Sequence, residues 1–194
     1  MGINNLWEYL LVSYPAADAM ALLQQERQQM ADAHKYIVAE KSKPTILIGH
    51  FLATESLETT IIKWTERICS NLSSLSVTLE GFTSIEPYSI GLRIKNPAAF
   101  RQLATHFKPV SDLIQASGYP MPHFLQHPQL SLAKWNNQAD YEQAFGIYAQ
   151  KYFSASFMLD ELFLLKRQDA SEACKTTQVF RLRPVNSQQF SDVA

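Results

Sequence analysis

Several residue types are scarce in this chain of 194 residues, and each scarcity argues against a class of site. The two cysteines, Cys69 and Cys174, stand far apart and lack metal-binding spacing, so neither a disulfide framework nor a zinc module is expected. Only six glycines are present, and they form no glycine-rich loop of the kind that cradles phosphates. No HExxH or CxxC motif occurs. We therefore expect neither a metal site nor a bound cofactor.

Charge and long apolar runs are also limited. Charged residues make up 18% of the chain and the formal net charge is -1, so no overall field favours nucleic acid. No apolar run approaches the roughly 18 residues that a membrane span needs. The first apolar segment, residues 7–14, contains Glu8 and follows no basic region, which favours a strand over a signal peptide. We expect a cytoplasmic protein without a membrane partner.

Two stretches of this chain, residues 43–51 and 127–135, share one design. Each has a proline, then a polar residue, then a run of β-formers, a small residue and an aromatic. Proline is tolerated at the first residue of a strand, so Pro44 and Pro128 mark the starts of two equivalent strands. The prolines lie 84 residues apart, which predicts a duplicated unit with a shared cleft.

Strand geometry assigns the side chains of these stretches to two faces. Successive side chains point to opposite faces, so Thr45 and Leu47 share one face while the neighbouring isoleucines take the other. By the same parity, Gln129 and Ser131 share one face and the leucines take the other. We expect the face that carries Thr45 and Leu47 on one strand, and Gln129 and Ser131 on the other, to line the cleft.

The remaining pattern predicts one α+β domain over residues 1–186, with repeat halves of about 1–95 and 96–186 and a loose tail at 187–194. Antiparallel strands and helices would surround a central cleft. The expected strands cover residues 7–14, 43–51, 76–82, 88–94, 127–135, 153–166 and 178–182. The expected helices cover residues 16–33, 54–71, 96–107, a second piece ending near 118, and 137–148. The helix at 54–71 has an apolar stripe that includes Trp64.

These features resemble the 2H phosphoesterases, the LigT-like group that includes 2′-5′ RNA ligases and cyclic phosphodiesterases. The resemblance rests on the two proline-led strands, on the predicted hairpin at 76–94, and on the closing segment near 159–167. It covers about residues 7–184. It implies a duplicated, two-lobed LigT-like fold with one His-x-Thr/Ser motif in each half.

Carried over to this chain, the motif positions fall on Thr45 and Leu47 in the first half and on Gln129 and Ser131 in the second. Only Ser131 keeps the family's residue type. In the family one imidazole removes a proton and the other donates one, which needs groups that titrate near neutral pH. Threonine and glutamine cannot do this, although they can donate hydrogen bonds.

Five histidines lie elsewhere in the chain, and none is an obvious replacement. His50 has the opposite parity to Thr45, so it should face away from the cleft unless a bulge intervenes. His127 shares the parity of Gln129 but lies roughly 7 Å away along the strand, and it is a weaker candidate for ligand contact. We expect His34, His106 and His123 to be solvated, in loops or near the ends of elements.

The resemblance therefore implies a cleft that has lost its catalytic histidines. The leading hypothesis is a catalytically inactive member that binds a nucleotide, an RNA end or another phosphate-bearing ligand through Thr45, Gln129, Ser131 and His127. Two alternatives remain open. One is an active cyclic phosphodiesterase or RNA ligase that uses relocated groups, and the other is a protein-interaction domain.

Overall fold

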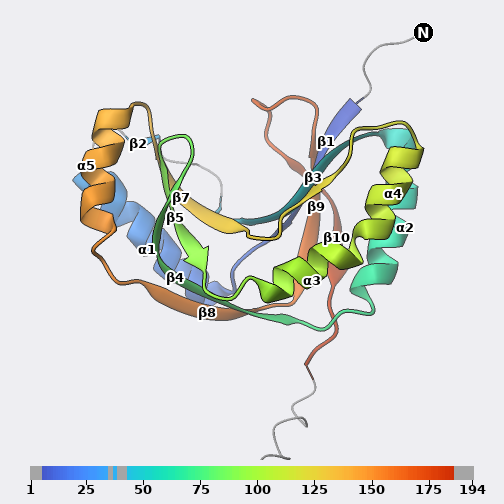
Figure 1. Ribbon diagram of the computed structural model, residues 1–194, viewed down its shortest axis with the longest axis horizontal. Helices are drawn as coiled ribbons and strands as arrows, with labels where there is room; N and C mark the ends of the chain where they lie inside the picture. Colours follow the sequence, from blue (N-terminus) through green and yellow to red (C-terminus); the bar gives the residue numbers. More distant parts are fainter. Residues whose placement is uncertain (1–5, 35–36, 39–42, 186–194) are drawn as a thin grey trace, which may run out of the picture.

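The computed structural model describes residues 6–34, 37–38 and 43–185 (Figure 1). The strands are β1 Leu6–Ser13, β2 Ile37–Val38, β3 Ile46–Thr54, β4 Leu75–Ile85, β5 Ser89–Ile94, β6 His123–Phe124, β7 Gln129–Trp135, β8 Ser154–Leu159, β9 Glu161–Arg167 and β10 Lys175–Arg181. The helices are α1 Ala17–Ala33, α2 Glu55–Cys69, α3 Ala98–His106, α4 Lys108–Ala116 and α5 Gln138–Tyr148. The tail predicted at 187–194 lies outside the described residues.

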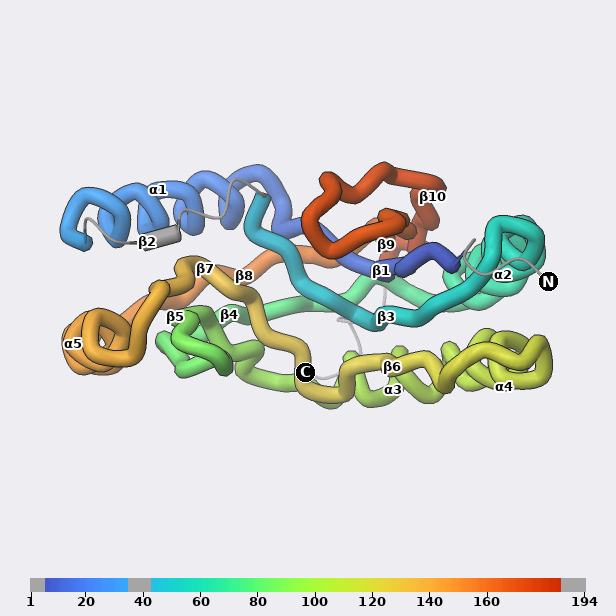
Figure 2. The backbone as a smooth tube through the Cα atoms, turned by 90° about the horizontal axis from the view of Figure 1, so that it is seen from above, coloured from blue at the N-terminus to red at the C-terminus, as the bar shows by residue number. Residues whose placement is uncertain are grey.

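All of the strands pair into one curled antiparallel sheet with the order β10-β9-β1-β3-β7-β5-β4-β8, to which β2 adds at β7 and β6 at β3. The view from above separates two lobes, with α2 and α4 beside one and α1 and α5 beside the other (Figure 2). The predicted α+β class and the two-lobed arrangement are therefore confirmed.

The two lobes meet at β3 and β7. Ile46 pairs with Leu130, and both side chains are fully buried. Ile48 is buried as well, whereas Thr45 and Leu47 are only half-buried on the other face. The alternation predicted for the first stretch is therefore present from Thr45 to Ile48.

Strands from both ends of the chain contribute to each lobe. The lobe that holds β1 and β3 is completed by β9 and β10 from the C-terminal part of the chain. The lobe that holds β7 and β8 takes β4 and β5 from the N-terminal part. The division into sequence halves near residue 95 stays a prediction. Each lobe contains strands from both sides of that residue.

The single strand predicted at 153–166 is wrong. Two strands occupy this range: β8 pairs with β4 at one end of the sheet, and β9 pairs with β1 and β10 in the other lobe. The exposed Asp160 separates them, and its carbonyl accepts a hydrogen bond of 2.8 Å from the Leu182 amide. A continuous apolar pattern does not reveal that the chain changes lobe at one polar residue.

The helices begin where the sequence predicts, but the side chain at the N-cap does not always bond to the helix backbone. Asn137 caps α5 by accepting a hydrogen bond from the Asp140 amide, as predicted. Thr54 stands at the N-cap of α2, yet its hydroxyl bonds to the hydroxyls of Tyr119 and Ser56. On the same helix Trp64 is 40% exposed, so its place in the apolar stripe was wrong.

Gly91 in β5 is the tightest backbone position in the lobe of β7. A Cβ atom here would collide with the carbonyl oxygen of Leu130 and with the side chain of Ile85. Gly146 is the opposite case, because it is an exposed helical glycine with open space around the position of a Cβ. These two glycines form a matched pair for testing the packing of the sheet.

We predict that Gly91→Ala lowers the free energy of unfolding by about 1–3 kcal/mol, because backbone atoms must move apart. Gly146→Ala should raise it by about 0.5–1 kcal/mol, because alanine favours the helix. Urea denaturation followed by circular dichroism measures both values. Equal midpoints for the two variants would show that β5 and β7 are less closely packed than these contacts imply.

Candidate functional site

The four motif-equivalent positions lie around the place where β3 and β7 meet. Continuing the Ile46–Leu130 register by one residue on each side sets Thr45 beside Ser131 and Leu47 beside Gln129. Each predicted histidine position, Thr45 or Gln129, therefore neighbours the predicted hydroxyl position of the other motif, Ser131 or Leu47. Two distant stretches of sequence thus build one continuous surface.

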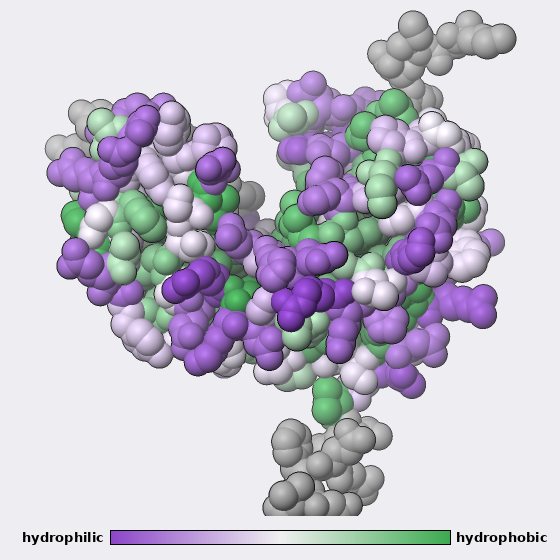
Figure 3. Space-filling view, viewed as in Figure 1, coloured by the Kyte–Doolittle hydropathy of each residue, from purple (hydrophilic) through white to green (hydrophobic). Residues whose placement is uncertain are grey.

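Three of these positions line a pocket of about 640 Å³ on the face of the sheet opposite to α2. They are Thr45, Leu47 and Ser131. The other lining residues come from β1, β9, β10, the segment before β3 and the loop before β10: Leu10, Val12, Tyr14, Lys43, Leu165, Arg167, Glu172, Ala173, Cys174 and Thr176. Figure 3 shows the surface hollowed between the lobes, and in the same view of Figure 1 the β9–β10 loop rises beside that hollow.

Gln129 and His127 lie outside this pocket. Gln129 is exposed and pairs with Arg93 of β5. His127 is exposed and lines a separate groove of about 810 Å³ along α3 and α4. The structure therefore groups Thr45 and Ser131 and sets His127 apart from them, because the chain turns away before β7 begins.

The hydroxyl of Thr45 already has a partner, since it donates a hydrogen bond of 2.6 Å to the carbonyl oxygen of Lys43. This contact fixes the rotamer and leaves the oxygen lone pairs available as acceptors. No hydrogen bond involves the Ser131 hydroxyl within the residues that the structure describes, and this side chain is half-buried. Ser131 is therefore the better placed of the two to donate to a ligand.

A β-bulge in β3 changes the orientation of His50. Leu11 pairs with Gly49 and Val12 pairs with Leu47, so Ile48 has no register partner in β1 and the alternation shifts by one residue. His50 consequently pairs with Leu10, whose side chain lines the pocket. The exception stated for His50 therefore applies: a bulge intervenes, and His50 lies on the face of Leu10.

A second bulge lies at the equivalent place in β7. Ile90 pairs with Ala133 and Gly91 pairs with Ser131, which leaves Leu132 without a partner. Ile48 and Leu132 are 84 residues apart, the same spacing as the two prolines. After this bulge Lys134 pairs with Ser89 and joins the face of Ser131. Alternation along the sequence alone did not predict that His50 and Lys134 lie on the pocket face.

The basic pair at the end of β9 is divided between the two faces of the sheet. Lys166 pairs with Tyr9 in register, and its ammonium contacts Glu55 at 2.7 Å and Glu58 at 2.8 Å on α2. Arg167 lines the pocket and forms an ion pair with Glu8 of β1. The hydrogen bond to Glu8 raises the pKa of the Arg167 guanidinium, so this group stays protonated and positively charged.

Two further hydroxyl and acid groups shape the pocket. Burial raises the pKa of the Tyr14 phenol, so this group stays protonated and can donate a hydrogen bond. On the opposite side, a carboxylate oxygen of Glu172 accepts from the Gln168 amide at 3.3 Å. The pocket thus has the carboxylate Glu172 on its loop side and two cations elsewhere, Arg167 at the end of β9 and Lys43 in the segment before β3. This asymmetry favours an anion near Lys43.

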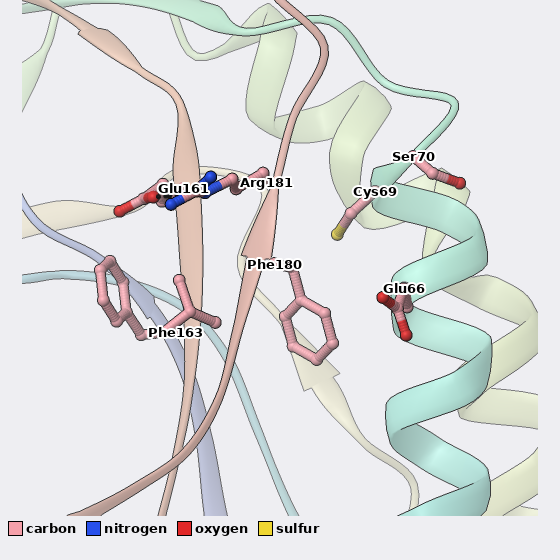
Figure 4. Close-up of a pocket in the computed structure, with 8 residues that line it drawn as sticks. Glu66, Cys69, Ser70, Glu161, Phe163, Phe180 and Arg181 are labelled. Carbon is pink, nitrogen blue, oxygen red and sulfur yellow. Dashed lines mark hydrogen bonds and ion pairs between the residues drawn. The ribbon is translucent and has the colours of Figure 1, made fainter.

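A second pocket of about 570 Å³ lies between α2 and the strands β9 and β10. The Cys69 sulfur points from α2 toward Phe180, and Arg181 lies beside Glu161 (Figure 4). Burial and the Glu66 carboxylate raise the pKa of the Cys69 thiol to about 12, so it stays protonated. This pocket contains none of the motif-equivalent residues.

The remaining histidines differ in their surroundings. His34 packs against the rings of Trp135 and Tyr148 at the end of α1, so it is half-buried instead of solvated. His123 is exposed but lies in β6, a strand of two residues that the sequence did not predict. His106 is exposed at the last residue of α3, as predicted.

Some pocket residues could have been found from the sequence and others could not. Parity in the predicted first strand would have placed Tyr14 on one face with Leu10 and Val12. Lys43 lies two residues before the first motif position, Thr45, and could have been noticed as a nearby cation. Arg167 and Thr176 depend on how β9 and β10 pair with β1, which no local pattern encodes.

No helix within the described part of the chain is long and apolar enough to span a membrane. Among the same residues, no group of three or more histidine, cysteine, aspartate or glutamate side chains could hold a metal ion.

Structural comparison finds the same fold in proteins of low sequence identity. The protein TT0787 of Thermus thermophilus has a TM-score of 0.67 at 13% identity, with 92% of this chain and 100% of that chain covered. E. coli LigT complexed with 3′-AMP has a TM-score of 0.65 at 14% identity, covering 91% and 98%. E. coli LigT complexed with NADP+ has a TM-score of 0.64 at 15% identity, with the same coverage.

A search of curated protein sequences found no match to this chain. The family model of the 2′-5′ RNA ligase superfamily matches residues 18–171, which include β3, β7 and all four motif-equivalent positions. That match covers well over half of the sequence. The chain therefore belongs to the 2′-5′ RNA ligase superfamily.

Proposed function

We propose that this protein binds a nucleotide or another phosphate-bearing ligand in the pocket lined by Thr45 and Ser131, without catalysis by motif histidines. The observation that carries the proposal is the composition of this pocket. Hydroxyl groups and cations line it, and no imidazole does. Its volume of about 640 Å³ is of the size that small-molecule ligands occupy.

The charges of the pocket suggest where a phosphate lies. Lys43 and Arg167 bring two positive charges, and Glu8 offsets that of Arg167. No ion pair involves Lys43 among the residues described, so its ammonium is available for a phosphate oxygen. Glu172 repels an anion from the loop side. A phosphate therefore fits best between Lys43 and Ser131, where a charge-assisted bond and a hydroxyl donor are both within the pocket.

The structural relatives support this ligand class. E. coli LigT has been crystallised with NADP+, 3′-AMP, ATP and phosphate. These ligands share a phosphate group and three of them carry an adenosine. In this chain the pocket at the junction of β3 and β7 offers hydrogen-bond donors that can hold such a group, but Thr45 and Ser131 cannot exchange protons with it near neutral pH.

An active cyclic phosphodiesterase or RNA ligase remains the second candidate function. The specific observation in its favour is His50, which the bulge turns to the pocket face beside Leu10. His50 does not line the pocket itself, so it would need to reach the ligand from the rim. Binding without motif catalysis is the better supported of the two.

We predict that Lys43→Ala and Ser131→Ala each weaken the binding of 3′-AMP by roughly 10- to 100-fold, the usual cost of losing a hydrogen bond to a charged group. Isothermal titration calorimetry measures the change. Lys63→Ala is the control, because this exposed lysine lies on α2, away from the pocket. Equal affinity in Lys43→Ala, Ser131→Ala and Lys63→Ala would place the ligand elsewhere.

We predict no turnover of 2′,3′-cyclic nucleotides or of 2′-5′-linked RNA ends above that of a Thr45→Ala, Gln129→Ala double variant. The reason is that neither residue exchanges a proton near neutral pH. The measurement is product formation over hours by chromatography. Clear turnover that the double variant lacks would establish an enzyme that uses these positions in another way.

Restoring the motif should restore part of the chemistry. The triple variant Thr45→His, Leu47→Thr, Gln129→His keeps Ser131, and the register places each new imidazole beside a hydroxyl of the other motif. Each proton-transfer group contributes about 10²–10⁴-fold, so hydrolysis of cyclic nucleotides should become measurable. A folded triple variant that binds 3′-AMP but remains inactive would show that further catalytic groups are missing.

Cys174 offers an independent test of ligand placement, because it lines the pocket while Cys69 is buried with a pKa raised to about 12. At a nucleotide concentration ten times the Kd, alkylation of Cys174 by a maleimide should slow about tenfold, since roughly one molecule in eleven is free. Mass spectrometry of peptides follows the reaction, with Cys174→Ser as the unreactive control. An unchanged rate would show that the nucleotide does not cover this wall.

A further inference from the structure

His50 and His123 face each other across two antiparallel strands. They are register partners in the β3–β6 pair, and their ring centroids lie 5.4 Å apart with a tilt of 50° between the planes. Both side chains are exposed. Within the described residues neither imidazole takes part in a hydrogen bond or an ion pair, so the ring nitrogens are available.

Packing behind the pair holds the two strands in register. The Phe124 ring lies over Gly49, where a Cβ atom would come within 2.5 Å of the ring, and it stacks on Phe107 at 5.0 Å. The Leu125 amide also donates to the Ile48 carbonyl at 2.8 Å. β6 is therefore fixed on β3 although it contains only two residues. The histidine backbones are positioned before any ligand binds.

The spacing of the two rings matches that of a metal chelate. An imidazole nitrogen binds zinc at about 2.0–2.1 Å, which places each ring centre about 3.2 Å from the ion and two tetrahedral partners about 5.2 Å apart. The observed separation of 5.4 Å is close to this value. Neutral imidazole suits zinc, copper and nickel. We propose that His50 and His123 form a two-histidine site for a divalent transition-metal ion such as Zn²⁺.

The site has two protein ligands and open coordination positions for water or another small donor. No third histidine, cysteine or carboxylate completes it among the residues described. His50 lies on the pocket face, since it pairs with Leu10, two residues along β1 from Val12, whereas His123 borders the groove along α3 and α4. The separation from the Leu47 end of the pocket is therefore about 7 Å. The inference does not depend on nucleotide binding.

The test uses the full chain without an affinity tag, titrated with ZnCl₂ in calorimetry at neutral pH. Wild type should bind one ion per chain. His50→Ala and His123→Ala should each weaken binding by at least about tenfold, because a second ligand on the same scaffold acts at high effective concentration. The exposed His106 on α3 supplies the matched control, and His106→Ala should bind within about twofold of wild type.

Two further readouts separate this site from others. Zn²⁺ should raise the thermal unfolding midpoint of wild type but not of the His50→Ala, His123→Ala double variant, because the ion links two strands only in the native state. His127→Ala should bind as wild type does: His127 borders the same groove along α3 and α4 as His123, but the ring contact of this site joins only His50 and His123. Undiminished binding in the double variant, loss of binding in His127→Ala, or no binding by wild type would each overturn the proposal.

Discussion

The meeting of β3 with β7 is the contact on which the rest of this structure depends. One registered pair, Ile46 with Leu130, joins two groups of four strands into a continuous sheet. Both side chains are completely buried, so the junction is stabilised by apolar packing while the opposite face stays open to solvent. The strands diverge on either side, and the widening gap between them is what leaves room for a cleft and for the added strand β6.

Much of this arrangement follows from the sequence. The prolines, the alternation at 44–48 and 128–132, and the resemblance together predict the α+β class, the strand junction and the face on which Thr45 and Ser131 lie. Local patterns succeed here because period-2 burial is decided by neighbouring residues. The same patterns fail at Asp160, where the chain changes lobe, because pairing with β4 or with β1 is decided by distant residues.

The bulges at Ile48 and Leu132 set a second limit on prediction. A single unpaired residue reverses the orientation of everything after it, so His50 and Lys134 move to the pocket face. Alternation counted from the proline gives the opposite answer. The equal spacing of bulges and prolines shows that the irregularity belongs to the predicted repeat as much as the strands do. His50 and Lys134 occupy equivalent places after the two bulges, because they too are 84 residues apart.

Stability and chemistry reside on different faces of the same two strands. The residues that hold the junction are buried apolar groups, whereas Thr45, Leu47 and Ser131 are half-buried at most and Gln129 is exposed. Substitutions at exposed or half-exposed positions usually change stability little, whereas truncation of a buried isoleucine or leucine costs several kcal/mol. The pocket face can therefore change its residues while the sheet keeps its form. A chain of this superfamily can therefore carry hydroxyl, amide and cationic side chains on this face without losing the strand junction.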